Sequence, residues 1–151
     1  MLRPSKKLVC TIEAVLDIAY NAADRPVRAK EITRRQGVPP RFLEPVLQDL
    51  VRAGVLDSVR GPRGGYRLAR ERRRITIGDL CRASGAFEEA SEEEMAPNGS
   101  ILAEQVVRPL WADLRSELAT RLESVTLDDL CQRAQSAGIP SQSGDCLDFN
   151  I

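Results

Sequence analysis

Three arginines lie close together in a segment rich in glycine and proline, with no acidic residue between them. They are Arg60, Arg63 and Arg67, in the run Val59-Arg60-Gly61-Pro62-Arg63-Gly64-Gly65-Tyr66-Arg67-Leu68. Guanidinium groups bind phosphates, and at the tip of a stiff hairpin they suit insertion into a narrow, electronegative DNA minor groove. Taken alone, the segment fits an ordinary solvated turn equally well. The elements on either side of it must decide between the two.

The residues that flank this loop have the pattern of two short strands. Apolar and polar residues alternate in residues 55–59 and again in residues 66–69. Two such runs joined by a Gly/Pro-rich connection are typical of a β-hairpin. Pro62 presets φ for the first central position of a turn, and we expect Gly64 and Gly65 to supply positive φ. The arginines would then stand at a projecting tip.

Two helices are predicted near the amino terminus. Residues 5–22 carry apolar side chains at helical spacing after Ser5, which suits the N-cap position: Leu8, Val9, Ile12, Val15, Leu16 and Ala19. Residues 29–36 form a shorter second helix, and Gly37 follows at the position that favours a left-handed conformation. We expect the exposed face of this second helix to carry three basic side chains, Lys30, Arg34 and Arg35.

A third helix is predicted between Pro40 and Gly54. Its apolar residues repeat at a spacing that turns one face inward: Leu43, Val46, Leu47, Leu50 and Val51. Pro45 lies inside this helix, where it removes a hydrogen bond to the carbonyl of Arg41. We therefore expect a bend, or a looser first turn, in the third helix.

The second and third helices, joined by a short turn, form a predicted helix-turn-helix, whose second helix enters the DNA major groove. Arg41 is suited to guanine or a phosphate, and Glu44 is suited to accept from cytosine N4. Gln48 lies about one turn deeper, at the limit of its reach. Taken singly, Glu44 is more simply a surface carboxylate near a helix N-terminus, but a helix-turn-helix favours the base contact. Lys6 and Lys30 complete the DNA contacts predicted on the helices.

Charge is divided unevenly along the chain. The formal net charge of the 151 residues is zero. Residues 1–75 nevertheless hold 17 Lys and Arg against 8 Asp and Glu, a net of +9, and the remainder holds 5 against 14, a net of −9. A basic first half beside an acidic second half favours a polyanion as the partner of the first half. Double-stranded DNA is the leading predicted partner.

Residue content argues against several classes of protein. Histidine is absent, which removes the commonest general base and the Ser-His and Cys-His nucleophile pairs, so we predict that the chain is not an enzyme. The four cysteines form no CxxC pair and match neither a zinc-ribbon nor a disulfide framework: Cys10, Cys81, Cys131 and Cys146. No apolar run approaches a membrane span and no signal-peptide pattern is present, so we expect a cytoplasmic protein without a membrane partner.

The second half begins with a basic linker, residues 70–74, which fits either phosphate contacts or a solvated loop. Thr76 and Asp79 have the spacing of a capping box, which predicts a short helix that ends near Ser84. Residues 85–100 are rich in glutamate and are expected to form a mobile acidic loop.

The longest periodic run follows this loop and predicts a long apolar helix, which Pro109 is able to kink. Its apolar positions are Leu102, Val106, Leu110, Trp111, Leu114, Leu118 and Leu122. Such a helix needs a partner surface. An antiparallel pair of these helices in a homodimer is favoured over packing within one chain, because palindromic DNA sites suit two-fold proteins. Thr126 and Asp129 repeat the capping-box spacing and start a last helix, which ends near Gly138.

Six motifs carry a family resemblance: Ser5-Lys6, Leu43-Glu44, the wing segment 58–66 with its Gly-Pro-x-Gly-Gly-Tyr core, Ile77-Gly78-Asp79-Leu80, Leu110-Trp111 and Thr126-Leu127-Asp128-Asp129-Leu130. Over about residues 1–135 the chain resembles the BadM/Rrf-type (IscR/NsrR/CymR-like) family of bacterial transcription regulators. The resemblance implies a homodimeric winged-helix protein that binds palindromic promoter sites, usually as a repressor. It also implies contacts through Arg41 and Glu44 of the recognition helix, and through four wing residues: Arg60, Gly61, Arg63 and Gly64.

Many members of that family sense iron or cluster status through three cysteines in the loop before the long helix. Here that loop, residues 85–104, contains no cysteine and no histidine. Glutamates stand in their place, and these suit hard cations or no metal. We therefore expect no metal, no iron–sulfur cluster and no other cofactor, with Cys81 as a buried structural thiol. The signal is left open between a protein partner, a small-molecule effector and oxidation of a thiol.

The sequence thus predicts a mainly α protein with a small β-hairpin. Residues 1–75 form a winged helix-turn-helix DNA-binding domain. Residues 76–138 hold the short helix, the acidic loop, the long dimerisation helix and the last helix, and residues 139–151 form a flexible tail. The predicted function is a homodimeric, sequence-specific repressor of transcription. The alternative is a winged-helix adaptor for a protein partner, but an adaptor has no reason to concentrate arginines in its first half.

Overall fold

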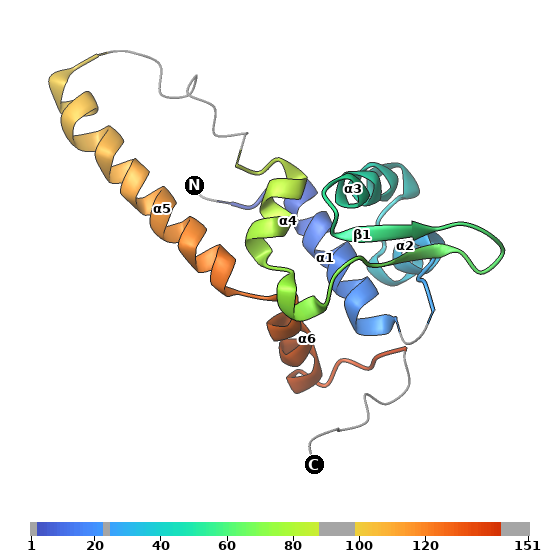
Figure 1. Ribbon diagram of the computed structural model, residues 1–151. Coiled ribbons are helices and arrows are strands. Elements are labelled where there is room, and N and C mark those ends of the chain that lie inside the picture. Colours follow the sequence, from blue (N-terminus) through green and yellow to red (C-terminus); the bar gives the residue numbers. More distant parts are fainter. Residues whose placement is uncertain (1–2, 23–24, 88–98, 143–151) are drawn as a thin grey trace.

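The computed structural model describes residues 3–22, 25–87 and 99–142 (Figure 1). The elements are α1 (Lys6–Asn21), α2 (Ala29–Gln36), α3 (Pro40–Arg52), β1 (Leu56–Val59), β2 (Gly65–Leu68), the 3-10 turn η1 (Arg72–Arg74), α4 (Ile77–Ser84), the π-helical turn η3 (Ala103–Val107), α5 (Arg108–Ser124) and α6 (Leu127–Ser136). The chain is mainly helical with one two-stranded antiparallel hairpin, which confirms the predicted fold class. None of the helices in the described residues has the length and apolar content needed to cross a bilayer.

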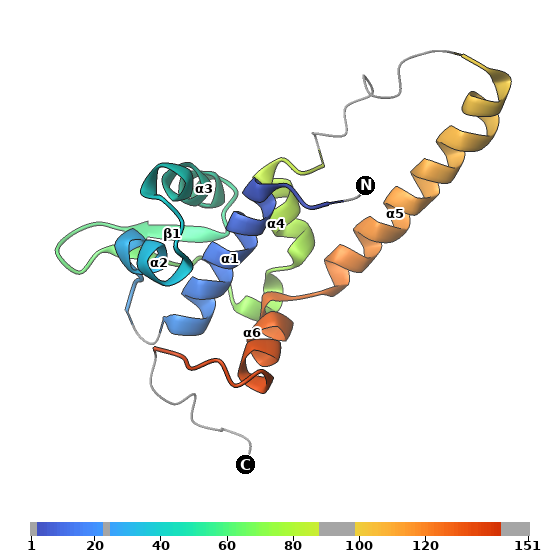
Figure 2. The same cartoon turned by 180° about the vertical axis from the view of Figure 1, so that it is seen from behind.

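Helix α1 runs through the centre of the body, and α2, α3, α4, α6 and the hairpin pack around it (Figures 1 and 2). The largest fully buried side chains come from nearly all of these elements: Ile18, Ile32, Leu43, Leu47, Leu50, Leu56, Ile75, Leu80 and Leu127. Burial of one such side chain contributes roughly 1.5–3 kcal/mol. One core therefore holds the first three helices, the hairpin, α4 and α6 together.

Three helices begin at the caps that the sequence predicts. The hydroxyl of Ser5 accepts a hydrogen bond from the N–H of Leu8 at 3.1 Å at the start of α1. At the start of α4 and of α6, a threonine and the acid three residues later each accept from the other's backbone N–H: Thr76 with Asp79, and Thr126 with Asp129. The N–H of Thr126 lowers the pKa of Asp129, because the hydrogen bond favours the ionised carboxylate.

The starts of α4 and α6 also pair with each other through the backbone. The N–H of Ile77 donates to the carbonyl of Val125 at 2.9 Å, and the N–H of Leu127 donates to the carbonyl of Ile75 at 2.8 Å. This short antiparallel bridge lies directly after α5. It anchors the carboxyl end of α5 to the body.

A cluster of charges at the same point holds the last turn of α5. The carboxylate of Glu123 accepts hydrogen bonds from the hydroxyl of Thr76, at 3.0 Å, and from the guanidinium of Arg82. The hydrogen bond from Arg82 lowers the pKa of Glu123. A Cβ atom at position 78 would lie 2.3 Å from a Glu123 carboxylate oxygen, so a side chain there would displace the end of the Glu123 side chain.

Helix α5 projects away from the body, on the side opposite the hairpin (Figure 1). A π-helical turn precedes it, and there the N–H of Arg108 donates to the carbonyl of Ala103, five residues earlier. Pro109 follows directly and has no N–H to continue the regular pattern. The sequence predicts a kink at Pro109, and the structure has a π-helical turn directly before it.

The carboxylate of Asp17 ties α1 to α2 from inside the body. Arg35 donates to it through Nη2 at 2.6 Å and through Nε at 2.9 Å, and Nε2 of Gln36 donates at 2.9 Å. The Asp17 side chain is only 1% exposed. Our expectation that Arg35 lies on the exposed face of α2 is wrong, because a carboxylate removed from water needs a cationic partner.

The basic linker is engaged with acids of this chain. Nε of Arg72 lies 2.6 Å from the carboxylate of Asp128 on α6, and Nη2 of Arg70 lies 3.6 Å from that of Asp79 on α4. These two arginines therefore join the linker to the helices that follow it.

The predicted tail is held against α1 where it begins. The hydroxyl of Ser141 donates to the carbonyl of Tyr20 at 2.6 Å, and the N–H of Gln142 donates to the side-chain oxygen of Asn21 at 3.0 Å. Residues 141 and 142 thus contact the end of α1, and the flexibility of the tail stays a prediction. Residues 143–151, and residues 88–98 of the predicted acidic loop, lie outside the described residues.

Replacing Asp17 with Ala should lower the free energy of unfolding by about 3 kcal/mol, because Arg35 and Gln36 then lose their buried acceptor. Urea denaturation at one fixed protein concentration measures this change. The matched control is Asp57→Ala, since Asp57 is exposed and, among the described residues, pairs only with Arg67, at 3.9 Å. The control should lower the free energy of unfolding by less than about 1 kcal/mol. Equal losses in the two variants would contradict the role given to Asp17.

Candidate nucleic-acid interface

Helix α3 presents its three predicted base-reading side chains on one solvent-exposed face. Arg41, Glu44 and Gln48 are all exposed, at a spacing of three and then four residues. The helix runs without interruption through Pro45, which is itself exposed. Helix α3 is therefore continuous at Pro45, and the three side chains follow one another along its surface.

An aromatic ring that the sequence analysis did not single out lies beside this face. Phe42 is 57% exposed, and the guanidinium carbon of Arg41 lies 5.1 Å from the centre of its ring. A cation over an aromatic face is attracted by the ring quadrupole, by about 0.5–1 kcal/mol at an exposed site. The contact holds the charge of Arg41 next to an apolar surface.

The hairpin has a five-residue loop, which starts at Arg60 because Val59 pairs with Gly65 in the last register position. Within the loop, the N–H of Gly64 donates to the carbonyl of Gly61 at 2.9 Å. Positive φ occurs at Gly61 (+110°) and Gly65 (+154°) and not at Gly64, so the expectation for Gly64 is wrong. Glycine is still required there, because a Cβ atom would lie 2.3 Å from the carbonyl oxygen of Val59.

The segment before α2 acts as a third short strand beside the hairpin. Val27 and Tyr66 exchange both backbone hydrogen bonds at 2.8 Å. A Cβ atom on Gly65 would lie 2.5 Å from the carbonyl oxygen of Val27, so this pairing depends on glycine. Further out, the guanidinium of Arg28 donates to the carbonyl of Pro62 in the loop. The wing is therefore held at its base and near its tip by residues that lead into α2.

The basic side chains of the wing differ in whether they pair with an acidic residue. Arg60 and Arg63 are exposed, and within the described residues neither forms an ion pair or a hydrogen bond. Arg67 faces Asp57 across the hairpin, with 3.9 Å between Nε and the carboxylate. The two arginines of the loop are therefore the wing residues that are most available to an anionic partner.

The remaining predicted contacts lie at the starts of two other helices. Lys6 and Lys30 are exposed in the first turns of α1 and α2, without an ion pair to any described residue. The neighbouring Lys7 pairs with Asp49 of α3 at 3.1 Å, so it links α1 to α3. The fold places α2, α3 and the hairpin together on the side away from α5 (Figure 1).

The apolar residues predicted for dimerisation lie mostly on the surface of the projecting helix. Leu102 is 72% exposed and Trp111 is 42% exposed, with Val106, Leu110, Leu114 and Leu118 between these values. Leu122 differs, because it is half-buried against the core. Six of the seven predicted residues are therefore exposed apolar side chains that do not pack against the core of the described residues.

Comparison with known proteins decides the family. The chain matches Rrf2, described as an iron-dependent transcriptional regulator, over residues 4–133. The chain belongs to the Rrf2 family of transcriptional regulators. It is 33% identical to the protein Rrf2 of Nitratidesulfovibrio vulgaris, over 80% of this chain and 81% of that protein.

Two solved structures are also similar to this Rrf2-family chain. CymR, the global cysteine regulator of B. subtilis, has a TM-score of 0.73 and 28% identity, over 88% of this chain and 98% of CymR. IscR of T. potens has a TM-score of 0.73 and 31% identity, over 93% of each chain. Because the family consists of transcriptional regulators, the prediction that the chain is not an enzyme is confirmed.

The description of the Rrf2 family names iron, and the described residues of this chain do not assemble a set of donors for it. The described residues contain no group of three or more His, Cys, Asp or Glu side chains that could hold a metal ion. Cys81 and Cys131 are buried in the body. Burial raises the pKa of Cys81, which favours the neutral thiol over the thiolate that a metal binds. The loop of residues 85–104 supplies neither cysteine nor histidine.

Sequence reasoning missed two residues of the interface. Arg28 contacts the loop from 34 positions away in the chain, and no local pattern signals such a contact. Phe42 was detectable as an aromatic residue at a helix position that faces solvent, between the buried Leu43 and the reading residue Arg41. Phe42 positions the charge of Arg41, and Arg28 both holds the loop and adds an exposed cation beside it.

Gly65→Ala should detach the wing from the segment before α2, because its Cβ atom would lie in contact with the carbonyl of Val27. Hydrogen exchange at the amides of Val27 and Tyr66 should become faster. The matched control is Gly61→Ala, which also has positive φ but meets nothing within 4 Å. The control should lower the free energy of unfolding by about 1–3 kcal/mol, through backbone strain alone. Unchanged exchange at Val27 in Gly65→Ala would refute the docking role of this glycine.

Proposed function

We propose that this Rrf2-family chain is a homodimer that binds palindromic promoter sites and represses transcription from them. In each copy, α3 lies in the major groove and the wing enters the adjacent minor groove. The observation that carries the proposal is the pair of unpaired arginines on a wing held by Val27 and Arg28. Two exposed cations on a positioned hairpin, without a partner among the described residues, suit the negative potential of a narrow groove.

The reading helix has a matching role in the proposal. Arg41 contacts a guanine or a phosphate, and Glu44 accepts from cytosine N4. Gln48, on the same exposed face, meets the following base pair or the backbone. Lys6 and Lys30, at the starts of α1 and α2, contact phosphates on either side.

The exposed face of α5 supports the homodimer. Exposed apolar patches of this kind on a soluble chain mark interaction surfaces. Two copies of α5 packed antiparallel would cover the face in both chains by one two-fold operation. Since the wing lies on the side of the body away from α5, the two reading units would then lie at opposite ends of the dimer, as two half-sites require.

The proposed regulator works without a metal or a cluster. Its cysteines lack the spacing for one, and the loop before α5 offers glutamates in place of soft ligands. The signal is then a protein partner, a small molecule or the oxidation of a thiol. The adaptor alternative has no particular observation in its favour, since it leaves the unpaired arginines of the wing without a role.

Gel-shift titration of promoter fragments at several salt concentrations tests the DNA-binding part of the proposal. If the dimer makes about six phosphate contacts, log K should fall against log salt concentration with a slope of about −5. Arg63→Ala should weaken binding by about tenfold, mostly at sites with A·T-rich flanks. Its control is Arg133→Ala, which removes the same charge from the exposed surface of α6.

Sequence-independent binding at every salt concentration would contradict the repressor and favour the adaptor. Equal affinities for Arg63→Ala and the wild type would contradict the role of the wing as a minor-groove probe. In either case the salt slope of the wild type gives the number of phosphates neutralised.

Leu114→Glu should convert the dimer to a monomer, because a carboxylate placed in the centre of the apolar face would be buried without a partner. Sedimentation velocity measures the mass directly. The matched control is Ser116→Glu, which adds the same charge two positions further along α5, on the other side of the helix. A dimer that survives Leu114→Glu would show that α5 does not form the interface.

A further inference from the structure

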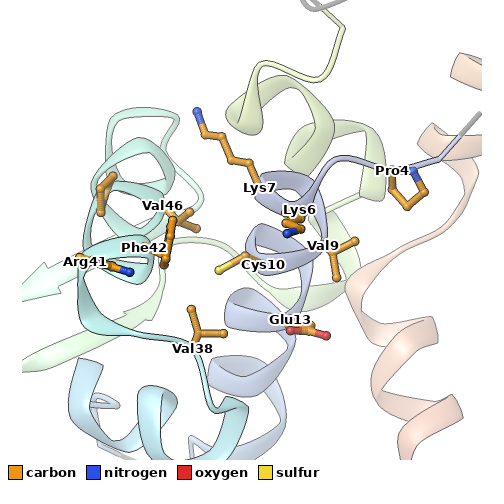
Figure 3. A pocket seen from close by; sticks show the side chains of 11 residues that line it. Pro4, Lys6, Lys7, Val9, Cys10, Glu13, Val38, Arg41, Phe42 and Val46 are labelled. Carbon is orange, nitrogen blue, oxygen red and sulfur yellow. The ribbon is translucent and has the colours of Figure 1, made fainter.

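A hollow of about 800 Å³ lies between α1 and the first turns of α3 (Figure 3). Its walls are mainly apolar: Val9, Cys10, Val38, Phe42, Pro45 and Val46. Cys10 points from α1 toward Phe42 and Val46 of α3 in this view. The volume falls within the range of small-molecule sites, roughly 300–1,000 Å³. The hollow therefore has the size and the lining of a ligand site.

Two large apolar side chains on its walls are unusually exposed. Phe42 is 57% exposed on α3 and Val9 is 38% exposed on α1. A ligand that covers both would remove this apolar surface from water, at about 25 cal/mol per Å². Burial raises the pKa of Cys10, with a smaller contribution from the carboxylate of Glu13. The Cys10 thiol in the wall of the hollow therefore stays neutral at neutral pH. The wall consequently offers no anion to a ligand apart from Glu13.

The rim of the hollow is basic. Lys6, Lys7 and Arg41 line it together with one acid, Glu13. Lys7 is already paired with Asp49 at 3.1 Å. Lys6 and Arg41 form no ion pair within the described residues, and the guanidinium of Arg41 lies over the Phe42 ring. Two unpaired cations beside an apolar wall favour an occupant with an apolar body and one anionic group.

A second copy of this chain fits the hollow less well. The apolar face of α5 could cover Phe42 and Val9, but it would bury Lys6 and Arg41 without partners, which is costly. An anionic group relieves this cost and an apolar helix face does not. Charge complementarity therefore distinguishes the two occupants.

We propose that the hollow between α1 and α3 is an effector site for a small amphipathic carboxylate, with its apolar body against Phe42 and Val9 and its carboxylate on Arg41. The regulatory consequence rests on the proposed function. Arg41 is also a predicted DNA contact, so a carboxylate on its guanidinium and a DNA phosphate or base exclude each other. Occupation of the hollow releases DNA, and DNA binding lowers the affinity for the effector by the same factor.

The probe for the test is 2-naphthoate, which has a flat apolar body and one carboxylate, and its neutral match is 2-naphthamide. Two-dimensional amide NMR spectra of the full chain locate the site, and calorimetry measures the affinity. We expect saturable binding of 2-naphthoate, with a dissociation constant of about 1 mM or tighter, and shifts at the amides of Val9, Cys10 and Val38. The naphthamide should bind about tenfold more weakly.

Two variants and one control accompany the probe. Arg41→Ala should weaken the binding of 2-naphthoate by about tenfold and leave the affinity for 2-naphthamide unchanged. Val9→Trp fills the hollow from an exposed position on α1 and should abolish the binding of both probes, while its thermal unfolding stays close to that of the wild type. Arg133→Ala, which loses the same charge on α6, should bind both probes as the wild type does.

Absence of saturable binding would overturn the proposal. So would shifts confined to α5, or equal affinity for the two probes. Shifts of the same amides that depend on protein concentration and block the probe would assign the hollow to a second copy and also overturn it. The spectra are recorded without DNA, so a chain that binds the probe but no DNA would refute only the proposed function. A chain that binds promoter DNA but not the probe would refute only the effector site.

Discussion

The carboxylate of Asp17 lies inside the body, and its contacts with Arg35 and Gln36 hold α2 against α1. A charge removed from water is stable only if its partners stay in place, so this contact limits how α2 can sit. Helix α3 follows α2 after three residues, and its buried face packs on α1. The position of the side chains on α3 that are proposed to read DNA therefore depends on one buried ion pair, together with the apolar core around Ile18, Leu43 and Leu47.

The two projecting parts of the molecule depend on contacts of another kind. Backbone pairing between Val27 and Tyr66, and the guanidinium of Arg28 on the loop, hold the wing. At the opposite side, Glu123 holds the last turn of α5 through Thr76 and Arg82. Both anchors lie beside a glycine: at Gly65 the backbone of Val27 leaves no room for a side chain, and at Gly78 the end of the Glu123 side chain occupies the space. Hydrogen bonds and close backbone approach, more than core burial, thus orient the surfaces proposed for DNA and for the second copy.

The sequence predicted most of the elements, because their signals are local. Caps at Ser5, Thr76 and Thr126, the apolar spacing of the helices and the Gly-Pro-x-Gly-Gly wing each depend on neighbouring residues alone. The features that it did not predict depend on partners distant in sequence. Arg35 was placed on the surface because its partner lies 18 residues away, and the hydrogen bonds of residues 141 and 142 reach back to the end of α1.

The candidate site follows the same rule. The positions of Arg41, Glu44, Arg60 and Arg63 followed from helix period and hairpin pattern, whereas the contact of Arg28 with the loop did not. The hollow beside α3 is a property of two helices that meet from different parts of the chain, so no single stretch of sequence signals it. Of the two glycines expected to have positive φ, Gly65 has it and Gly64 does not, since the loop places positive φ at Gly61 and space alone requires Gly64.

Selection of bound duplexes from a random DNA library tests the central claim most directly, because one experiment both finds the operator and reveals its symmetry. The account predicts enrichment of an inverted repeat, with two half-sites related by a two-fold axis and A·T-rich positions where the two wings meet the minor groove. Enrichment of a single unrepeated site, or no enrichment over the starting library, would contradict recognition by a homodimer of this chain.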